Sequence, residues 1–145
     1  MNETLRKIIQ DDPGIDFENY NLAEEIAKYD GDDPQGWQIV IRVYVPKKVR
    51  KIGSILLADS TVDKLNQDER FINFTGLVVK MAPGVYKDEE RYCLTGKYCT
   101  VGDWVMFPRA HGNTYAYNGL TTLTINEDAI LKKIKDPRSI TRISV

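Results

Sequence analysis

Apolar residues near the N-terminus of this 145-residue chain recur with a helical period. Spacings of three and four residues predict a helix over residues 2–10, which the Asp-Asp-Pro-Gly sequence at 11–14 ends. A second helix is predicted after Asn21, because Asn21 and Glu24 have the spacing of a capping pair. The first 36 residues are therefore expected to form a short, partly helical N-terminal extension.

From Trp37 onward the apolar positions alternate, as they do in β-strands. The segment 38–45 predicts a strand with one buried face and one solvent-facing side that carries Val40, Arg42 and Tyr44. The other predicted strands are Phe71–Met81, Trp104–Phe107, Tyr115–Tyr117 and Leu120–Ile125. Many short strands without interleaved helices predict an all-β fold, a small antiparallel β-barrel.

Two glycine positions refine this picture. Gly76 interrupts the strand over residues 71–81 and predicts a bulge or a sharp bend. Asn118-Gly119 separates the last two strands and is the dipeptide most typical of a two-residue hairpin turn.

Residues 46–70 predict no regular element. They hold six basic and four acidic residues around one apolar island at 53–58. A loop of this length inside a small domain is commonly functional. Read from the residues alone, Ile55, Leu56 and Leu57 also fit a short buried strand of the barrel.

The charge is unevenly distributed along the chain. Residues 1–36 carry ten acidic and three basic residues, whereas residues 37–145 carry 17 basic and 11 acidic residues. An acidic segment therefore precedes a mildly basic body. It is interpreted as a solubilising or docking arm, and the alternative is an arm folded onto its own body or onto a neighbouring subunit.

Composition and motifs narrow the functional classes. The apolar runs are too short for a membrane span, and no secretory signal is visible at the N-terminus. The two cysteines are expected to be reduced thiols, and with a single histidine they predict no metal site. No phosphate-binding loop and no catalytic constellation is present, so we expect neither a cofactor nor enzymatic activity.

Residues 37–136 resemble the GroES family of co-chaperonins, especially the divergent copies carried by bacteriophages. Four pieces occur in the family's order. The first is the strand at 38–45 with the basic loop that holds Gly53, Ser54, Ile55, Leu56 and Leu57. The second is Gly76-Leu77-Val78-Val79 with Pro83-Gly84, and the third is Val101-Gly102-Asp103-Trp104-Val105-Met106-Phe107. The fourth is Asn126-Glu127-Asp128-Ala129-Ile130-Leu131. The acidic extension 1–36, the tail 137–145 and the tyrosine-rich stretch 85–98, which replaces the family's roof hairpin, depart from the pattern.

The resemblance implies a co-chaperonin, an oligomeric lid that is heptameric in the family. Its partner is a GroEL-type chaperonin, bound through a mobile loop at about residues 46–70, and it assists ATP-dependent protein folding. Gly53, Ser54, Ile55, Leu56 and Leu57 would form the binding segment. The implied location is the cytoplasm, that of the bacterial host for a phage-encoded copy, with no membrane or nucleic-acid partner.

Two other functions use the same barrel. The first alternative is a phage virion structural protein, such as a head decoration, collar or tail component, whose partners are other virion proteins. The second is a nucleic-acid-binding barrel, suggested by the basic body and eight tyrosines. It is disfavoured because the tyrosines are dispersed and no basic stripe is evident.

Overall fold

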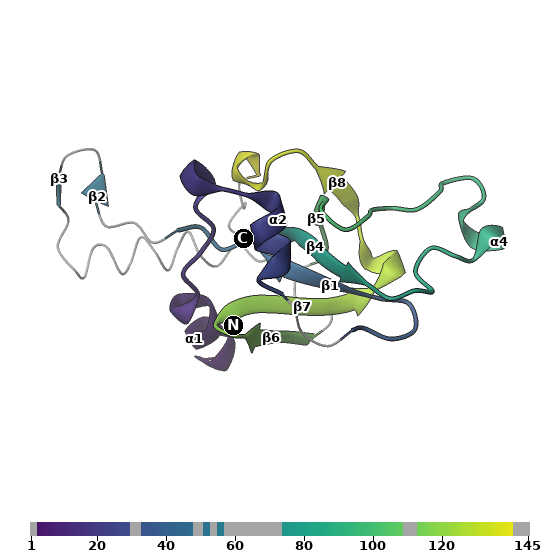
Figure 1. Ribbon diagram of the computed structural model, residues 1–145, viewed down its shortest axis with the longest axis horizontal. Coiled ribbons are helices and arrows are strands. Elements are labelled where there is room, and N and C mark those ends of the chain that lie inside the picture. The colour runs from purple at the N-terminus through teal and green to yellow at the C-terminus, as the bar shows by residue number, and fades with distance from the viewer. Residues whose placement is uncertain are drawn as a thin grey trace.

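Six antiparallel strands form one sheet in the order β6-β7-β1-β4-β5-β8 (Figure 1). The computed structural model describes residues 3–29, 33–47, 51–52, 55–56, 74–108 and 113–140. The strands of this sheet are β1 (Gln38–Val43), β4 (Thr75–Met81), β5 (Trp104–Met106), β6 (Asn113–Tyr117), β7 (Leu120–Asn126) and β8 (Lys132–Ile134). A separate pair, β2 (Lys51–Ile52) and β3 (Ile55–Leu56), makes a second small sheet. The predicted β-rich fold is confirmed.

The helices are short and lie outside the strand order. They are α1 (Glu3–Asp11), α2 (Leu22–Ala27) and α4 (Glu89–Tyr92), with 3-10 turns η1 (Phe17–Asn19), η2 (Glu127–Ala129) and η3 (Pro137–Ser139). Asn21 caps α2 as its spacing predicted, since its side chain accepts a hydrogen bond from the Glu24 amide at 3.1 Å. Within the described residues, none of these helices has the length and apolar character that a membrane crossing requires.

The strand β1 is central, because it pairs with β4 on one side and with β7 on the other. Its register with β4 shifts between Val40 and Ile41, which leaves Val79 as an extra residue, a β-bulge. The bulge expected at Gly76 is therefore displaced along the strand. Gly76 has a different role: a Cβ there would overlap the Ile41 side chain and lie 2.6 Å from the Arg42 carbonyl oxygen.

The hairpin between β6 and β7 confirms the prediction made from Asn118-Gly119. Tyr117 pairs with Leu120 across the turn. Both turn residues have positive φ, 50° at Asn118 and 81° at Gly119. Two positive φ angles are what a type I′ turn requires, and Asn followed by Gly adopts them with the least strain.

Both faces of the sheet are buried, by two separate hydrophobic clusters. One cluster gathers alternate residues of the strands, including Ile39 and Ile41 of β1 and Leu123 and Ile125 of β7. The other, called the outer-face cluster below, lies on the opposite face of β1, β4 and β5. Its buried members are Ile15, Tyr29, Val40, Tyr44, Leu77, Val79 and Trp104, with Phe17, Tyr20, Ile26, Tyr117 and Ile134 packed against them.

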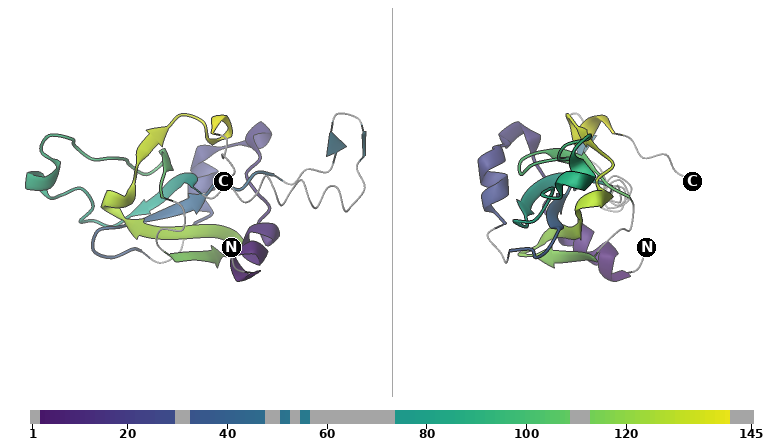
Figure 2. Two further views of the ribbon diagram at one scale, coloured as in Figure 1. Left: turned by 180° about the vertical axis from the view of Figure 1, so that it is seen from behind. Right: turned by 90° about the vertical axis from the view of Figure 1, so that its right-hand side faces the viewer.

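The N-terminal segment covers the outer face of the sheet. Ile15 and Tyr29 are buried there with Val40 and Tyr44, and in Figure 2 the helix α2 lies against one side of the strands. The solvent-facing side predicted for β1 is therefore wrong, because the preceding segment excludes water from it. The described part of the acidic segment is an arm folded onto its own body, which was the alternative interpretation.

Candidate functional site

The predicted binding residues fall partly on the small second sheet. Ile55 and Leu56 form β3, which pairs antiparallel with β2, Ile52 opposite Ile55 and Lys51 opposite Leu56. Gly53, Ser54 and Leu57 lie outside the described residues. Figure 1 draws β2 and β3 away from the six-stranded sheet. The expectation of no regular element in residues 46–70 is wrong for these four residues, and β3 is not a strand of the main sheet.

The two ends of this long connection begin side by side on the sheet. The chain leaves β1 through Tyr44 and Val45, and it returns through Phe74 into β4. The Tyr44 amide donates to the Thr75 carbonyl at 2.9 Å, and the Phe107 amide donates to the Phe74 carbonyl at 2.9 Å. These backbone bonds fix the place from which the connection starts and to which it returns.

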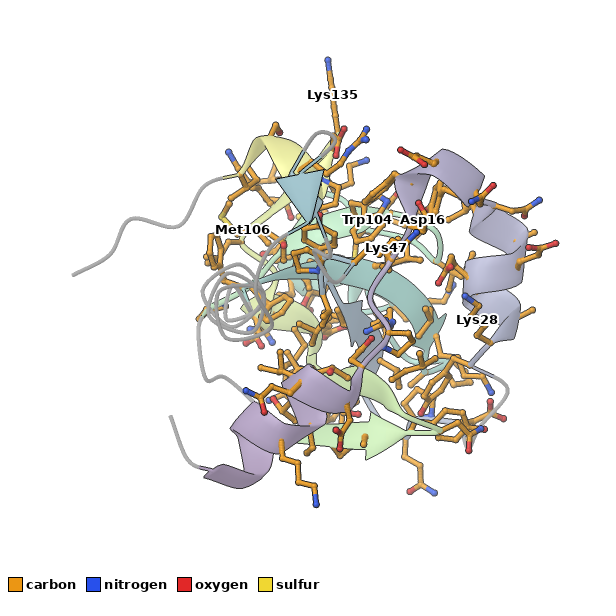
Figure 3. All side chains as sticks on the ribbon, turned by 90° about the vertical axis from the view of Figure 1, so that its left-hand side faces the viewer. Asp16, Lys28, Lys47, Trp104, Met106 and Lys135 are labelled. Carbon is orange, nitrogen blue, oxygen red and sulfur yellow. The ribbon has the colours of Figure 1, made fainter. Side chains whose placement is uncertain are left out.

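The N-terminal segment contacts the outgoing end of this connection directly. Ile15 forms a parallel β-bridge with Pro46, and its amide donates to the Val45 carbonyl at 2.8 Å. Lys47 pairs with Asp16, with 3.1 Å between Nζ and Oδ2, and both side chains are labelled in the end-on view of Figure 3. The residues that precede the predicted binding segment are thus held from outside the sheet.

A buried ion pair fastens the same part of the N-terminal segment to the sheet. Both side chains are almost fully buried, and the Arg42 guanidinium donates to the two Asp12 oxygens at 2.6 and 2.8 Å. The amides of Thr121 and Gly14 also donate to Asp12, at 2.7 and 2.8 Å. Arg42 donates further to the Val43 carbonyl at 2.9 Å. Charge-assisted hydrogen bonds of this bidentate kind are stronger than those between neutral groups and are specific in geometry.

Burial alone would raise the pKa of Asp12, because it disfavours the charged carboxylate. The positive charge of Arg42 and the hydrogen bonds from Arg42, Thr121 and Gly14 outweigh it, so the pKa of Asp12 lies below its ordinary value. Asp12 is therefore ionised at neutral pH. The sequence offered one signal for this pair: an arginine in the middle of an otherwise apolar strand requires a buried acidic partner if that face is covered.

The segment that follows Asp12 packs through Phe17 against an aromatic cluster on the sheet. The Phe17 ring lies 5.9 Å from Tyr44 and 5.8 Å from Trp104, measured between centroids. The Arg138 guanidinium, held by Asp136, lies over the Phe17 ring at 4.4 Å from its centroid. Contacts of this kind add to the burial of the rings. The segment from Asp12 to Phe17 is thus fixed at both ends.

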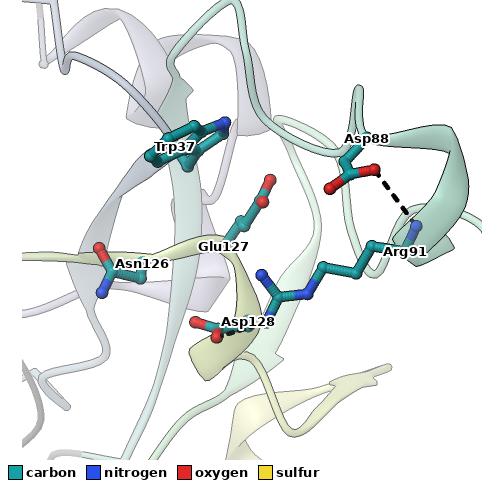
Figure 4. Close-up of a pocket in the computed structure, with 6 residues that line it drawn as sticks. All are labelled: Trp37, Asp88, Arg91, Asn126, Glu127 and Asp128. Atoms are coloured by element: carbon teal, nitrogen blue, oxygen red, sulfur yellow. Dashed lines mark hydrogen bonds and ion pairs between the residues drawn. The ribbon is translucent and has the colours of Figure 1, made fainter.

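A polar pocket of about 520 Å³ lies at the opposite end of the sheet (Figure 4). It is lined by Trp37, Asp88, Arg91, Asn126, Glu127 and Asp128. The Arg91 guanidinium pairs with Asp128 at 2.8 Å, and the Asp88 carboxylate accepts a hydrogen bond from the Arg91 amide at 3.3 Å. Arg91 therefore already has a carboxylate partner within the pocket.

Tyrosines attach the stretch 85–98 to the turn η2. The hydroxyl of Tyr86 donates to the Glu127 carbonyl at 2.7 Å, and the Tyr86 amide donates to the Glu127 carboxylate. Tyr92 and Tyr98 pack against Tyr86 with ring centroids 5.1 and 5.3 Å away. Burial, and then the nearby Glu127 carboxylate, raise the pKa of Tyr92 to about 12. Tyr92 therefore stays neutral at physiological pH, and the three rings pack against one another.

Burial raises the pKa of the Cys99 thiol, which disfavours its reactive thiolate form. In the part of the chain that the structure describes, no three His, Cys, Asp or Glu side chains are grouped so that they could hold a metal ion. No protein-family model matches the chain, and no curated protein matches its sequence.

Proposed function

We propose that this protein is a co-chaperonin: an oligomeric lid that binds a GroEL-type chaperonin through Ile55, Leu56 and Leu57 and assists ATP-dependent folding. The sequence resemblance of residues 37–136 to the GroES family suggests it. The observation that carries it is the placement of Ile55 and Leu56 in a two-stranded ribbon outside the main sheet. This argues against the alternative in which these residues are a strand of the barrel core.

The proposal includes a GroES-like barrel and a ring. The outermost strands of the main sheet are β6 and β8, and we infer that the sheet curves into the small barrel of that family. The subunits would assemble into a closed ring, heptameric as in the family, that presents several identical ribbons to a ring of identical grooves.

The energetics of such a contact suit a lid that must also leave. Full burial of one leucine or isoleucine side chain contributes roughly 1.5–3 kcal/mol. Ordering a loop on binding offsets much of that, so a single ribbon would bind weakly. In a ring, each contact after the first is intramolecular, and the summed binding becomes strong. A small change in each groove, driven by the nucleotide state of the chaperonin, would then release the whole lid.

The test is ATP-dependent co-elution of the protein with a GroEL-type chaperonin on size exclusion, with mass read by light scattering. Wild type is expected to co-elute only with ATP, and L56D is expected to lose this binding. The control is L94D, because Leu94 is 96% exposed in the turn after α4 and undergoes the same change away from the ribbon. If L56D binds as well as L94D does, the assignment of the binding segment is wrong.

A failure of the folded wild type to co-elute would favour the virion alternative. That alternative predicts stoichiometric amounts of the protein in purified phage particles, measured by mass spectrometry. A virion protein could use an N-terminal arm to contact its neighbours in the particle. The described part of that arm instead packs on its own sheet through Ile15 and Tyr29, which is why the co-chaperonin is proposed first.

A further inference from the structure

The N-terminal segment lies across the point where the chain leaves β1. At this point Ile15 is 2% exposed and makes a backbone bridge to Pro46, and its amide bonds to the Val45 carbonyl. The Lys47–Asp16 ion pair extends the contact by one residue toward β2. Three consecutive residues of the outgoing chain, Val45 to Lys47, are therefore held by two residues of the N-terminal segment, Ile15 and Asp16.

This segment can resist displacement of the outgoing chain, because both of its ends are anchored to the sheet. On one side Asp12 binds the Arg42 guanidinium and the Thr121 amide. On the other side Phe17 packs against Tyr44 and Trp104. A displacement of Pro46 or Lys47 would have to break their contacts with Ile15 and Asp16, and the segment that holds these two residues is itself anchored to the main sheet.

We propose that residues 12–17 act as a clamp that fixes the position and direction in which Val45–Lys47, the chain that leads to the chaperonin-binding segment, leaves the sheet. The clamp residues are positioning residues, since they act on the binding segment through Val45–Lys47. This inference rests on the proposed co-chaperonin function and deepens it. It assigns to the acidic N-terminal segment a role in binding that composition alone does not suggest.

The position of each binding segment matters because, after the first contact of a ring, every further contact depends on the effective concentration of the segment at its groove. Once one ribbon is bound, the strength of the next contact depends on how closely the remaining ribbons point at their grooves. A fixed starting point also lowers the ordering cost of each contact. A small loss at each subunit compounds around the ring, so loosening the clamp is expected to weaken binding far more than it destabilises one subunit.

Gly14 supplies a variant that loosens the clamp selectively. Its φ is +80°, and a Cβ at this position would overlap the Pro46 carbonyl oxygen and lie 2.8 Å from the Lys47 Cα. The variant G14A therefore pushes residues 46 and 47 away from the N-terminal segment. Gly119 is the matched control, since its φ is +81° and a Cβ there meets nothing within 4 Å. G119A carries the same backbone strain without the contact.

A second pair of variants is milder and is not expected to prevent folding. D16N removes the charge that pairs with Lys47. D33N removes the charge that pairs with Lys80 at 2.7 Å, at an exposed position that is likewise in the N-terminal region. Both changes delete one ion pair of the surface and leave a side chain of nearly the same shape.

The experiment measures the ATP-dependent affinity of each full-length variant for a GroEL-type chaperonin, at a temperature where circular dichroism shows all of them folded. G14A is expected to bind at least about tenfold more weakly than G119A. D16N is expected to bind a few-fold more weakly than D33N. A merely structural role would lower the unfolding temperature of G14A without this difference in affinity among fully folded samples.

The outcomes separate the clamp from the function on which it rests. If wild type does not bind the chaperonin, the proposed function fails, and the clamp loses its role with it. If wild type binds and the members of each pair bind equally, the clamp alone is overturned. If G14A does not fold, the comparison of D16N with D33N decides, and equal affinities in that pair overturn the inference.

Discussion

Removing the Asp12 carboxylate is expected to detach the N-terminal segment from the sheet and to destabilise the whole domain. In the variant D12A, Arg42 keeps its charge in a site where its side chain is 4% exposed. Among the described residues, only the carbonyl groups of Val43 and Thr121, at 2.9 and 3.4 Å, remain as acceptors. A buried charge without a counter-ion is among the most costly defects a protein can carry.

The magnitude follows from the number of lost contacts. Removing one partner of a buried ion pair costs about 3–5 kcal/mol. The Thr121 amide also loses its acceptor, and an unpaired buried donor costs about 1–3 kcal/mol. These terms overlap because they share one carboxylate, so we expect a total of about 4 kcal/mol. That is a large part of the roughly 5–15 kcal/mol by which a domain is stable.

The assay is urea denaturation followed by tryptophan fluorescence. Trp104 is 8% exposed and packs against Phe17, so its emission reports the docking of the segment, whereas Trp37 is 64% exposed and changes little. With a urea dependence of about 2 kcal/mol per molar, the midpoint should fall by about 2 M. The control D33A removes an exposed pair and should cost at most about 1 kcal/mol.

A double variant tests whether the loss comes from the uncompensated charge. Replacing both partners, as in D12A with R42M, removes the buried charge together with its counter-ion. It should therefore be more stable than D12A alone. A midpoint for D12A that matches D33A, or a double variant that is less stable than D12A, would refute the assignment of this pair as the anchor of the N-terminal segment.

Two further predictions concern acid and packing. The pKa of Asp12 in the folded protein lies below 3.8, because the Arg42 charge and the hydrogen bonds outweigh burial. The ionised Asp12 carboxylate therefore stabilises the fold fully above about pH 4, and this stabilisation is lost as the pH falls through the folded pKa. The stability difference between wild type and D12A, measured by urea denaturation, should therefore shrink below about pH 4; a constant difference would contradict the lowered pKa. G76A would force a Cβ into Ile41 and the Arg42 carbonyl oxygen, and should cost about 1–3 kcal/mol by the same assay; wild-type stability would show that β1 and β4 are not so close.

The strands could be predicted because their signals are local. Alternation of apolar residues marks β1 and β7, and Asn118-Gly119 selects its turn through backbone preferences that need no tertiary partner. The short strand β8 was not predicted, because its sequence Lys-Lys-Ile has no alternating pattern. It forms because the exposed edge of β5 offers it backbone partners.

The docking of the N-terminal segment could not be predicted because its signals are not local. Ten acidic residues dominate the composition of the first 36 residues, and most of the described ones remain at the surface. The contacting residues, such as Ile15 and Tyr29, are interleaved among them. The pair that fixes the segment joins Asp12 to Arg42, 30 residues away. Arg42 in an apolar strand signals that an acidic partner is needed, but a single sequence does not show which residue that partner is.

The candidate site was located by resemblance rather than by pattern. Six basic residues around one apolar island indicated only a functional loop. The strands β2 and β3 are each two residues long, which is too short for a periodic pattern of apolar residues to appear in the sequence. The contact between Ile15 and Pro46 gave no sequence signal except Gly14, whose place in an Asp-Asp-Pro-Gly sequence read as a helix stop.

These contacts determine how the N-terminal segment can be studied. A chain that began at Trp37 would expose Val40, Tyr44 and Trp104 of the outer-face cluster and would leave the Arg42 charge without its carboxylate. Such a truncation would lose activity by misfolding or aggregation whatever the segment does. Only substitutions that keep the cluster and the ion pair intact can separate a role in binding from a role in stability. Alanine at Gly14 meets this condition, because it keeps the backbone amide that donates to Asp12 while its Cβ meets the outgoing chain at Pro46 and Lys47.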